Sequence, residues 1–320
     1  MRRTITSLQG LLCFESAAKH QSYTHASQEL FITQSAVSRQ IQQLEELLGL
    51  SLFNRTRHGV ELTQAGQQYY QSIKPYLIGL EQCTLDVITH KGLGGTLKLG
   101  VVPTFATRWL LPKLQRFNQI HPEITIHLET STKPFLFNEN IFDAAIYAGT
   151  QQQIDHWPGT QTHFLMTEDV VPVCSPQLIE KHFPDAKKIN AHCYDLDSEQ
   201  IIQLPLLQQT TRLNIWQEWC EKHQIEHPKP FEGQRHELFS MLAVAATHSM
   251  GMALIPQMLI KKELESSELV IATNKTLTGV RSYYLVHSSQ ENSMLIEKFV
   301  DWIQHELKNE ALPYSFGTIE

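Results

Sequence analysis

The chain has 320 residues, of which 42% are hydrophobic and 18% are charged, a composition typical of folded globular domains. This length predicts two or three domains. No uncharged apolar run approaches the roughly 18–20 residues that a membrane-spanning helix requires, and the N-terminus has no apolar signal-peptide core. We therefore expect a cytoplasmic protein that does not bind membranes.

The net charge of −7 argues against a protein that coats nucleic acid, and the charge is unevenly distributed. Residues 1–63 hold six Lys and Arg against five Asp and Glu, whereas residues 93–320 hold 18 against 26. Any contact with DNA is therefore expected in the first segment. Because nonspecific affinity depends on the number of neutralised phosphates, this balance disfavours an architectural DNA binder that acts without a ligand.

Apolar residues at helical spacing predict three helices in the first fifty residues. They cover residues 8–18, residues 22–30 behind a hydroxyl cap, and residues 34–48, which Thr33 caps. The third helix carries one apolar stripe that must pack inward, formed by Val37, Ile41, Leu44 and Leu48.

The opposite face of the third helix is polar, which suits the major groove, where Gln can pair with adenine and Arg with guanine. A solvated face without a partner is the alternative. Two strand-like pieces at 52–53 and 60–62 flank a basic loop, a hairpin suited to phosphates or the minor groove, and this wing favours DNA binding. The predicted DNA contacts are Thr33, Gln34, Ser35, Ser38, Arg39 and Gln42 on the helix, with Arg55, Arg57 and His58 in the wing.

Residues 64–92 are predicted to form a long helix that begins after Thr63. Its apolar stripe advances in three- and four-residue steps, as in a two-helix seam, and predicts a homodimer; packing on its own chain is the alternative. Pro75 should bend this helix or remove one backbone hydrogen bond. Glycines from Gly92 mark the boundary. The stripe consists of Ala65, Tyr69, Ile73, Leu77, Leu80, Thr84 and Val87.

Residues 93–320 alternate between strand and helix patterns, which predicts α/β layers around a largely parallel sheet. The expected strands are 96–101, 124–128, 144–147, 170–174, 252–255 and 283–286, and the expected helices are 214–224, 237–247, 257–264 and 293–307. Another helix, after Pro103, is expected to bury Trp109, Leu111, Leu114 and Phe117.

Two features of this half allow alternative interpretations. The polar segment 182–203 is interpreted as a solvated loop, with a ligand lid or a partner surface as the alternative. Trp216 and Trp219, three residues apart on one helix, are expected in the core rather than at a ligand platform.

Several motifs, in their order and spacing, resemble the LysR-type transcriptional regulators. They are Phe14–Ala18, Thr33–Ile41, Leu44–Glu45, Leu48–Gly49, Leu52–Phe53, Arg55 and Leu62–Gly66. The resemblance implies a multi-domain α/β protein that binds promoter DNA as a homodimer or homotetramer, contacts RNA polymerase and senses a small-molecule effector. Activation is the expected mode.

The same resemblance implies three parts. These are a winged helix-turn-helix at 1–63, a linker and dimerisation helix at 64–92, and an effector domain at 93–320 with the fold of periplasmic solute-binding proteins. Subdomain I covers about 93–167 and 269–320, and subdomain II about 168–268. The chain is expected to cross between them near Met166–Glu168 and Ser266–Ile271.

Ligands of such sheets bind beyond the carboxyl ends of the strands. Similarity to the glycine-cleavage and β-lactamase-inducing subgroup, at 103–110, 143–146, 157–159 and 173–176, makes Thr104 the main effector contact. Tyr147 stands where the family often has arginine, which weakens the expectation of an acidic effector. The predicted effector contacts are Pro103, Thr104, Phe105, Thr130, Ser131 and Tyr147, with His236 and Glu237 closing from the other subdomain.

Two other classes of protein are disfavoured. An enzyme would need a phosphate loop, a nucleophile elbow or a Ser/His/Asp set, and none is present. The one metal-like spacing, His223, Glu226 and His227, is followed by Pro228, which disfavours the required helix. The five cysteines are scattered, so we expect no metal, cofactor or catalysis. A secreted solute-binding protein would lack the DNA-reading segment. Amino acids, peptides, aromatic acids and drugs all remain open as effectors.

Overall fold

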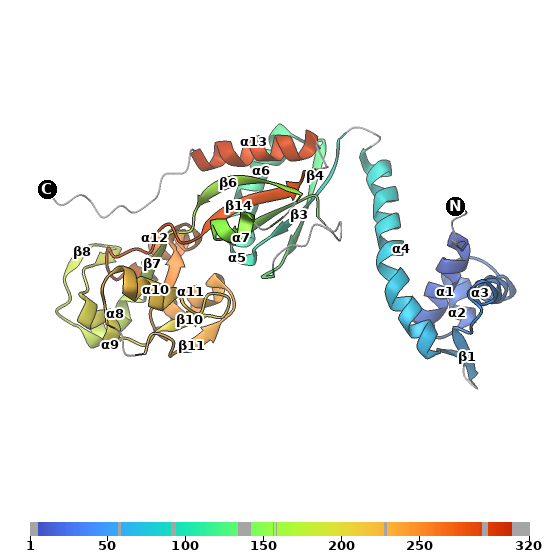
Figure 1. Ribbon diagram of the computed structural model, residues 1–320, viewed down its shortest axis with the longest axis horizontal. Helices are drawn as coiled ribbons and strands as arrows, with labels where there is room; N and C mark the ends of the chain where they lie inside the picture. Colours follow the sequence, from blue (N-terminus) through green and yellow to red (C-terminus); the bar gives the residue numbers. More distant parts are fainter. Residues whose placement is uncertain are drawn as a thin grey trace. The chain divides into compact units, whose positions relative to one another are not determined.

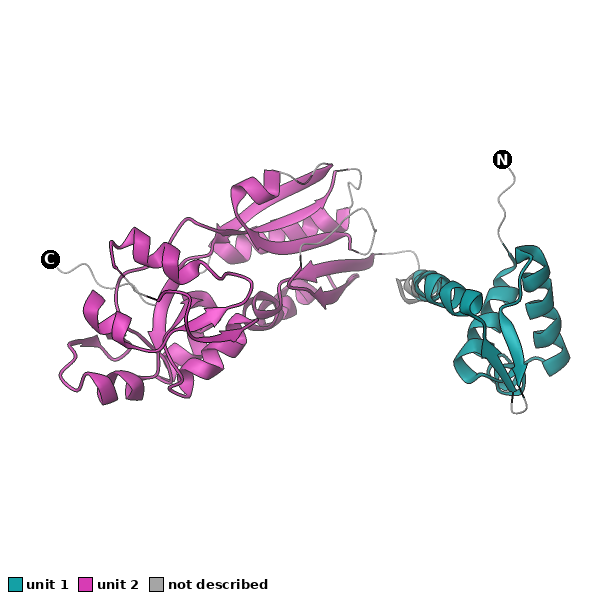
Figure 2. Cartoon of the chain, turned by 60° about the horizontal axis from the view of Figure 1, so that its bottom comes forward, with its two compact units in different colours: residues 1–92 teal, residues 93–320 magenta. Residues whose placement is uncertain are grey.

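The computed structural model describes residues 6–56, 59–90, 94–133, 142–155, 157, 159–226, 229–289 and 294–308. The chain divides into two compact units, Met1–Gly92 and Leu93–Glu320 (Figures 1 and 2). We call them unit 1 and unit 2. No helix in the described part of the chain is long and apolar enough to cross a membrane.

Unit 1 begins with three helices, α1 (Leu8–His20), α2 (Tyr23–Glu29) and α3 (Gln34–Leu48). Each starts at a hydroxyl that accepts a hydrogen bond from a backbone amide of the first turn: Ser7 from Gly10, Ser22 from His25, and Thr33 from Ala36. The helix α3 ends at Gly49, whose φ of 69° lies in the left-handed region that favours glycine. The predicted three helices and the caps at Ser22 and Thr33 are confirmed.

The core of unit 1 is built around Phe14, which has no exposed surface. Its ring contacts those of Phe53 and Tyr69, with centroids 5.4 and 5.5 Å away. Phe53 opens the wing, in which β1 (Phe53–Thr56) pairs antiparallel with β2 (Gly59–Leu62). The predicted wing contacts Arg57 and His58 lie outside the described residues.

The long helix α4 (Gln64–His90) starts where Thr63 Oγ1 accepts a hydrogen bond from the Gly66 amide. Gly66 lies so close to the wing that an added Cβ would sit 2.1 Å from the carbonyl oxygen of Leu52. Any larger residue at position 66 would therefore push α4 away from the base of the wing.

The first part of the apolar stripe of α4 is packed against unit 1, and the second part is exposed. Tyr69 and Ile73 pack against the core of unit 1, so the own-chain alternative holds for this first part. Further along, Leu80 and Val87 are 49% and 70% exposed. The second part of the stripe is therefore available to another chain, whereas the first part is not.

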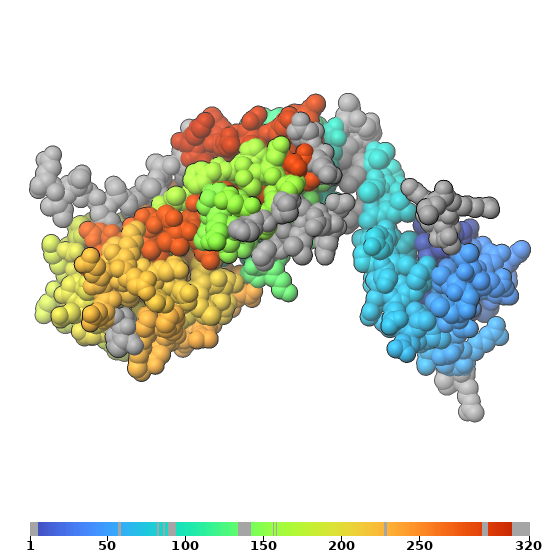
Figure 3. All heavy atoms as spheres, viewed as in Figure 1, coloured from blue at the N-terminus to red at the C-terminus, as the bar shows by residue number. Residues whose placement is uncertain are grey.

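Unit 2 contains two five-stranded sheets, with strand orders β4-β3-β5-β14-β6 and β12-β7-β13-β9-β8. Figure 3 shows two lobes, one mainly green and red, the other yellow and orange. Their strands are β3 (Gly95–Val101), β4 (Ile124–Thr130), β5 (Ala144–Gly149), β6 (Thr160–Thr167), β7 (Val170–Cys174), β8 (Lys188–Asn190), β9 (Cys193–Tyr194), β12 (Ala253–Pro256), β13 (Val270–Ile271) and β14 (Ser282–Ser288). A separate parallel pair joins β10 (Leu207–Gln209) to β11 (Gln234–His236).

The prediction of a largely parallel sheet is wrong. In the first sheet β3 pairs parallel with β4 and β5, but β14 is antiparallel to β5 and β6. In the second sheet β7 is antiparallel to both of its neighbours. The reason is that the chain passes from one sheet to the other through extended segments, so that β14 returns without a crossover helix.

Helices cover both sheets. In the first lobe, α6 (Leu111–Ile120) and α13 (Met294–Lys308) lie side by side on one face (Figure 1), and the Phe117 and Phe299 rings meet at 5.5 Å. The remaining helices are α5 (Pro103–Phe105), α7 (Gln151–Asp155), α8 (Pro176–His182), α9 (Ser198–Gln203), α10 (Ile215–Lys222), α11 (Phe239–Thr247), η3 (Gln257–Leu259) and α12 (Lys261–Glu265).

The chain passes between the sheets twice. The first crossing, at Glu168 and Asp169, joins β6 to β7. The second was predicted near Ser266–Ile271, which is wrong, because Val270 and Ile271 still pair with β7. It occupies the residues between Leu277, which still forms a bridge with Val170 of β7, and Ser282. The two crossings are bonded together, since the Glu168 amide donates to the Arg281 carbonyl oxygen at 2.9 Å.

The prediction that Leu111 faces the core is wrong: Leu111 is 49% exposed, and Leu110 is fully buried in its place. Ala106–Leu110 form one π-helical turn, η1, in which the Leu111 amide bonds to the Ala106 carbonyl five residues back. A π turn holds an extra residue, which changes the phase of every position after it.

The interpretation of 182–203 as a solvated loop is also wrong. Cys193 and Tyr194 form the buried strand β9, which pairs with β13, and Asp197 caps α9 in a reciprocal capping box. The buried side chains in this segment, Cys193, Tyr194, Leu196 and Ile201, follow neither a strand nor a helix period. The core assignment of Trp216 and Trp219 is confirmed, since both are buried and their indole N–H groups donate to the carbonyl oxygens of Leu207 and Lys275.

Candidate DNA-binding face and effector cavity

Helix α3 presents two different faces. Val37, Ile41 and Leu44 are buried against the other helices of unit 1. On the other side Gln34, Ser35, Arg39 and Gln42 are exposed and Ser38 is half-buried. A rigid helix with one buried apolar stripe and one exposed polar face has the layout of a recognition helix.

The predicted DNA contacts differ in how free their side chains are. Thr33 is engaged as the cap of α3, and its hydroxyl also bonds to Ser35 at 3.1 Å. Gln42 donates one amide N–H to Glu46 at 2.9 Å, which leaves its second N–H and its amide oxygen available to a base. Arg39 has no hydrogen bond or ion pair with any described residue, and Arg55 is exposed on β1.

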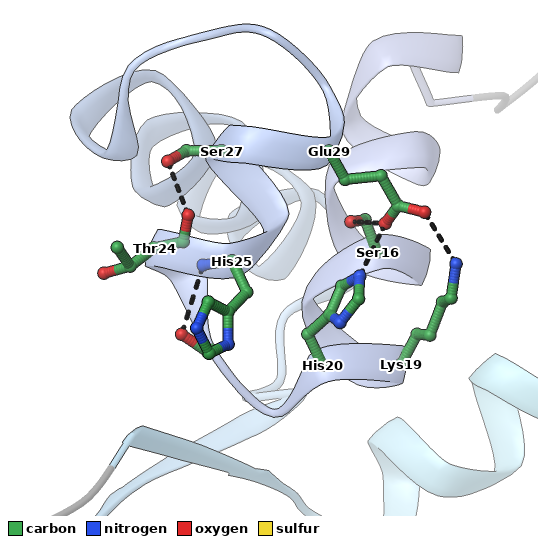
Figure 4. A network of polar contacts seen from close by, with 8 residues as sticks. Ser16, Lys19, His20, Thr24, His25, Ser27 and Glu29 are labelled. Carbon is green, nitrogen blue, oxygen red and sulfur yellow. Dashed lines mark hydrogen bonds and ion pairs between the residues drawn. The ribbon is translucent and has the colours of Figure 1, made fainter.

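A polar network fixes α2 against α1, as Figure 4 shows. The Glu29 carboxylate accepts hydrogen bonds from Lys19 Nζ at 2.6 Å and from the Ser16 hydroxyl, and it contacts His20 Nε2 at 2.9 Å. The bonds from Lys19 and then Ser16 lower the pKa of Glu29 to about 2. The network thereby sets the position of α2, the helix that precedes the recognition helix.

Replacing Glu29 by glutamine is expected to destabilise unit 1 by about 1 kcal/mol at neutral pH, a modest loss because the carboxylate is partly solvated. The pKa is lowered in the folded chain, so this stabilisation exists above the unfolded pKa of about 4.5. It disappears as the pH falls towards 2. Hydrogen exchange of α1 and α2 amides at pH 7 and at about pH 3 measures the difference. Glu46→Gln, at an exposed position of α3, is the control, and equal exchange in all three proteins at pH 7 would contradict the assignment.

In unit 2 the two lobes, which are the two subdomains predicted from the sequence, enclose a cavity of about 150 Å³, here called the cleft. Two side-chain contacts cross it: Thr104 Oγ1 accepts from the Ser240 amide at 3.2 Å, and Thr132 Oγ1 donates to Glu237 Oε1 at 2.8 Å. The cleft is lined by Val102, Pro103, Thr104, Phe105, Thr132, Tyr147, Ala148, Gln153, Gln209, Thr211, Arg212, Glu237, Leu238, Phe239, Leu259, Arg281 and Tyr283.

Five predicted effector contacts therefore lie together in the lining: Pro103, Thr104, Phe105, Tyr147 and Glu237.

The structure places the other three predicted contacts elsewhere. Thr130 is exposed at the end of β4, and Ser131 accepts a hydrogen bond from the Lys133 amide within its own turn. His236 lines a different, more apolar hollow together with Arg108 and Met241.

Sequence reasoning missed the two arginines of the cleft, Arg212 and Arg281. Arg212 follows β10, whose three residues are too few to show a strand pattern, so the sequence gives no sign that a strand ends before Arg212. Arg281 precedes β14, but β14 runs antiparallel to β5, and Ser282 pairs with Gly149 at the carboxyl end of β5. The rule that ligands bind beyond the carboxyl ends of parallel strands therefore does not point to Arg281, which lies at the amino end of β14.

These arginines change the electrostatics expected of the cleft. Arg212 Nη2 donates to Glu168 at 2.7 Å, and its guanidinium lies 4.9 Å from the centre of the Phe239 ring. Both arginines also line a second cavity of about 340 Å³ together with Thr211 and Glu168. Tyr147 in place of an arginine therefore does not disfavour an acidic effector, because Arg212 and Arg281 bring positive charge to the cleft from other elements.

The metal-like and thiol side chains have structural surroundings. His223 Nε2 contacts the Thr276 carbonyl oxygen at 2.9 Å, while His227 and Pro228 lie outside the described residues. Among the residues that the structure describes, no three His, Cys, Asp or Glu side chains gather as metal ligands would. Burial raises the pKa of Cys174 to about 12.

Comparison with known proteins accounts for both units. Residues 8–67 match the family described as bacterial regulatory helix-turn-helix protein, lysR family, and residues 90–308 match the LysR substrate binding domain. The chain is 31% identical over 317 residues to the glycine cleavage system transcriptional activator of Escherichia coli K12, covering 99% of both proteins. It is 33% identical over 299 residues to the HTH-type transcriptional regulator DsdC of the same strain, covering 92% of each.

Solved structures share the fold at lower identity. The AmpR effector binding domain from Citrobacter freundii superposes with a TM-score of 0.57 at 23% identity, over 67% of this chain and 99% of that domain. Full-length AphB of Vibrio cholerae gives 0.55 at 23% identity, over 93% and 98%. With a DNA-binding helix-turn-helix and an effector-binding domain matched in order, the chain belongs to the LysR family of bacterial transcriptional regulators, which are not enzymes.

Proposed function

We propose that this regulator activates transcription when a small molecule binds in the cleft. In this proposal it acts in the cytoplasm as a homodimer or homotetramer on promoter DNA and contacts RNA polymerase. The observation that carries the proposal is the exposed polar face of α3, opposite the buried Val37, Ile41 and Leu44. Activation is supported by the names of the relatives, which include transcriptional activators.

The DNA contacts are divided between helix and wing. Arg39 and Gln34 read base edges in the major groove, because both are exposed on the polar face of α3. Thr33, Ser35, Ser38 and Gln42 complete the α3 contacts on bases or phosphates, and Arg55, Arg57 and His58 bind the backbone or minor groove from the wing.

The dimer seam is formed by the free part of α4. Leu80, Val87 and Ile88 are exposed, and a groove between α4 and α1 is lined by Leu12 and Leu77. An apolar surface of this kind favours a second copy of the same helix over solvent.

Effector binding in the cleft controls the arrangement of the two subdomains. Thr104 and Thr132 of the first subdomain bond directly to Ser240 and Glu237 of the second. A ligand that adds to these contacts binds the arrangement of the subdomains that forms them better than one that does not. It thereby shifts the population between assemblies with different spacing of their DNA-binding units. The proposal requires neither a metal nor a cofactor.

Replacing Thr104 by valine is expected to raise the effector concentration for half-maximal induction about 3- to 10-fold. The change keeps the shape of the side chain but removes an acceptor used by the Ser240 amide, a loss of about 0.5–1.5 kcal/mol. A promoter–reporter titration measures the response, and reporter activity without effector separates a lost response from a lost protein. Thr107→Val is the control, because the Thr107 hydroxyl bonds only to carbonyl oxygens of its own helix. Identical induction curves for the Thr104 variant and the natural chain would show that Thr104 has no part in the response to the effector.

The proposed function as a whole is tested by footprinting the purified chain on the DNA upstream of its own gene, with and without a metabolite panel. We expect protection over several helical turns that shortens or shifts with one compound. Absence of protection at low salt, where phosphate contacts are strongest, would contradict operator binding at this site.

A further inference from the structure

Arg281 occupies a distinctive place in unit 2. It is the last residue of the second crossing, its carbonyl oxygen bonds to the Glu168 amide of the first crossing, and its side chain is half-buried. It lines the cleft and also the second cavity. A ligand that contacts the Arg281 side chain therefore contacts a residue of the two bonded segments that connect the subdomains.

The positive charge of Arg281 has no counterion among the described residues. Two acids act on its charge, Glu168 and Glu218, and both line the second cavity with it. Glu168 is bonded to Arg212 at 2.7 Å, with both of those side chains largely buried. Across the cleft, Glu237 accepts a hydrogen bond from Thr132. No carboxylate of the described chain lies within ion-pair distance of Arg281.

The surroundings make this charge costly to keep. Burial, and then the neighbouring Arg212, lower the pKa of Arg281 below its ordinary value. A guanidinium removed from water without a paired anion loses several kcal/mol of solvation. Glu168 is held by Arg212, and Glu218, on the far side of the second cavity from the cleft lining, acts on Arg281 without forming an ion pair, so the Arg281 guanidinium keeps hydrogen-bond donors that a bound anion would engage.

The rest of the lining limits the size and type of that anion. The cleft holds about 150 Å³, smaller than the roughly 300–1,000 Å³ of drug-sized sites. Around the arginines, Thr104, Gln153 and Gln209 offer neutral hydrogen-bonding groups. A small molecule with one planar anionic group fits this arrangement, because a carboxylate matches the two parallel N–H donors of a guanidinium.

We propose that the effector is a small carboxylate whose carboxyl group binds the Arg281 guanidinium in the cleft. This inference rests on the proposed function and names the ligand class for the same cleft. Glu168 keeps Arg212 engaged, so Arg281 is the arginine left for the ligand. Binding then joins the ligand to the second crossing and, through the Glu168 amide, to the first.

The test uses the full chain and isothermal titration calorimetry at constant ionic strength. The probes are small monocarboxylates and α-amino acids from two to five carbons, each paired with its primary amide. We expect at least one acid to bind the natural chain at least about tenfold more tightly than its amide, a difference typical of a lost charge-assisted bond. Arg281→Gln should remove that preference, and Arg281→Lys, which keeps a point charge, should retain part of it. Arg235→Gln removes an exposed arginine outside both cavities and is the matched control.

Three results would overturn the proposal: equal binding of acid and amide, an Arg281→Gln variant that binds the acid as the natural chain does, or no binding of any acid. All five tryptophans lie in residues 93–320, so their fluorescence verifies that unit 2 of each variant is folded. If Arg281→Gln fails to fold, the acid–amide comparison on the natural chain and the lysine variant decide the question. The footprint in the absence of ligand is independent of these outcomes, and its failure alone would count against the proposed function.

Discussion

Replacing Phe14 by alanine is expected to destabilise unit 1 by about 3–5 kcal/mol, the cost of deleting a large aromatic side chain from a core. Phe14 has no exposed surface, and its ring contacts Phe53 of the wing and Tyr69 and Tyr70 of α4. The loss therefore affects the helices, the wing and the linker helix at once. Since domains are stable by only about 5–15 kcal/mol, a large part of the DNA-binding unit's stability depends on this ring.

The matched control is Phe31→Ala, because Phe31 is 93% exposed in the turn before α3. Amide hydrogen exchange resolved along the full chain should show faster exchange across α1 to α4 in the Phe14 variant and unchanged exchange in the Phe31 variant. Tryptophan fluorescence reports only on unit 2, so the unfolding temperature that it measures should be the same in both variants. Unchanged exchange in α1 of the Phe14 variant would show that the core of unit 1 is centred elsewhere.

Replacing Arg39 by alanine is expected to weaken operator binding by about 1–3 kcal/mol, the range for one arginine on a base edge. Arg39 is exposed on the polar face of α3 and has no partner in the described chain, so no internal contact is lost with it. Its whole guanidinium is available to a guanine, which offers two acceptors in the major groove.

Titration of labelled operator, with nonspecific DNA as competitor, separates two roles for Arg39. A base contact predicts lower operator affinity and relaxed preference at one position, whereas a phosphate contact weakens all sequences alike and lowers the salt slope by about one. Lys187→Ala, which removes one exposed cation from unit 2, is the control. Unchanged operator affinity of the Arg39 variant would exclude this residue from the interface.

The DNA-binding unit could be predicted from its sequence almost completely, because its signals are local. Thr33 caps α3 and Gly49 ends it, and the buried stripe follows a regular helical period between them. Such rules need no knowledge of residues far away in the chain.

The strand β6 of unit 2 was not predicted. Its side chains do not alternate cleanly between buried and exposed, and a register shift opposite Tyr283 and Tyr284 interrupts its pairing with β14.

The cleft could be predicted only in part, because it is assembled by tertiary pairing. Thr104 follows a recognisable strand, whereas Arg281 reaches the cleft only because β14 runs antiparallel to β5. The π turn before Leu111 is likewise invisible in a helical pattern, since an inserted residue looks like a change of face. Strand direction and helix phase are decided by the packing of the whole unit, and the sequence pattern alone does not contain them.

The close approach of Gly66 to Leu52 has a mechanical consequence. The Leu52 carbonyl group leaves no room for a Cβ at position 66, and the Leu62 side chain lies on the same side, so the start of α4 is packed closely on the base of the wing and is expected to move together with it. Twenty-seven helical residues make a lever about 40 Å long. A tilt of roughly 5° at its far end would carry the wing about 3.5 Å, close to the 3.4 Å rise of one base pair. Small rotations at the end of α4 would thus produce displacements of the wing on the scale of one base pair, and a larger side chain at position 66 would loosen the contact that transmits them.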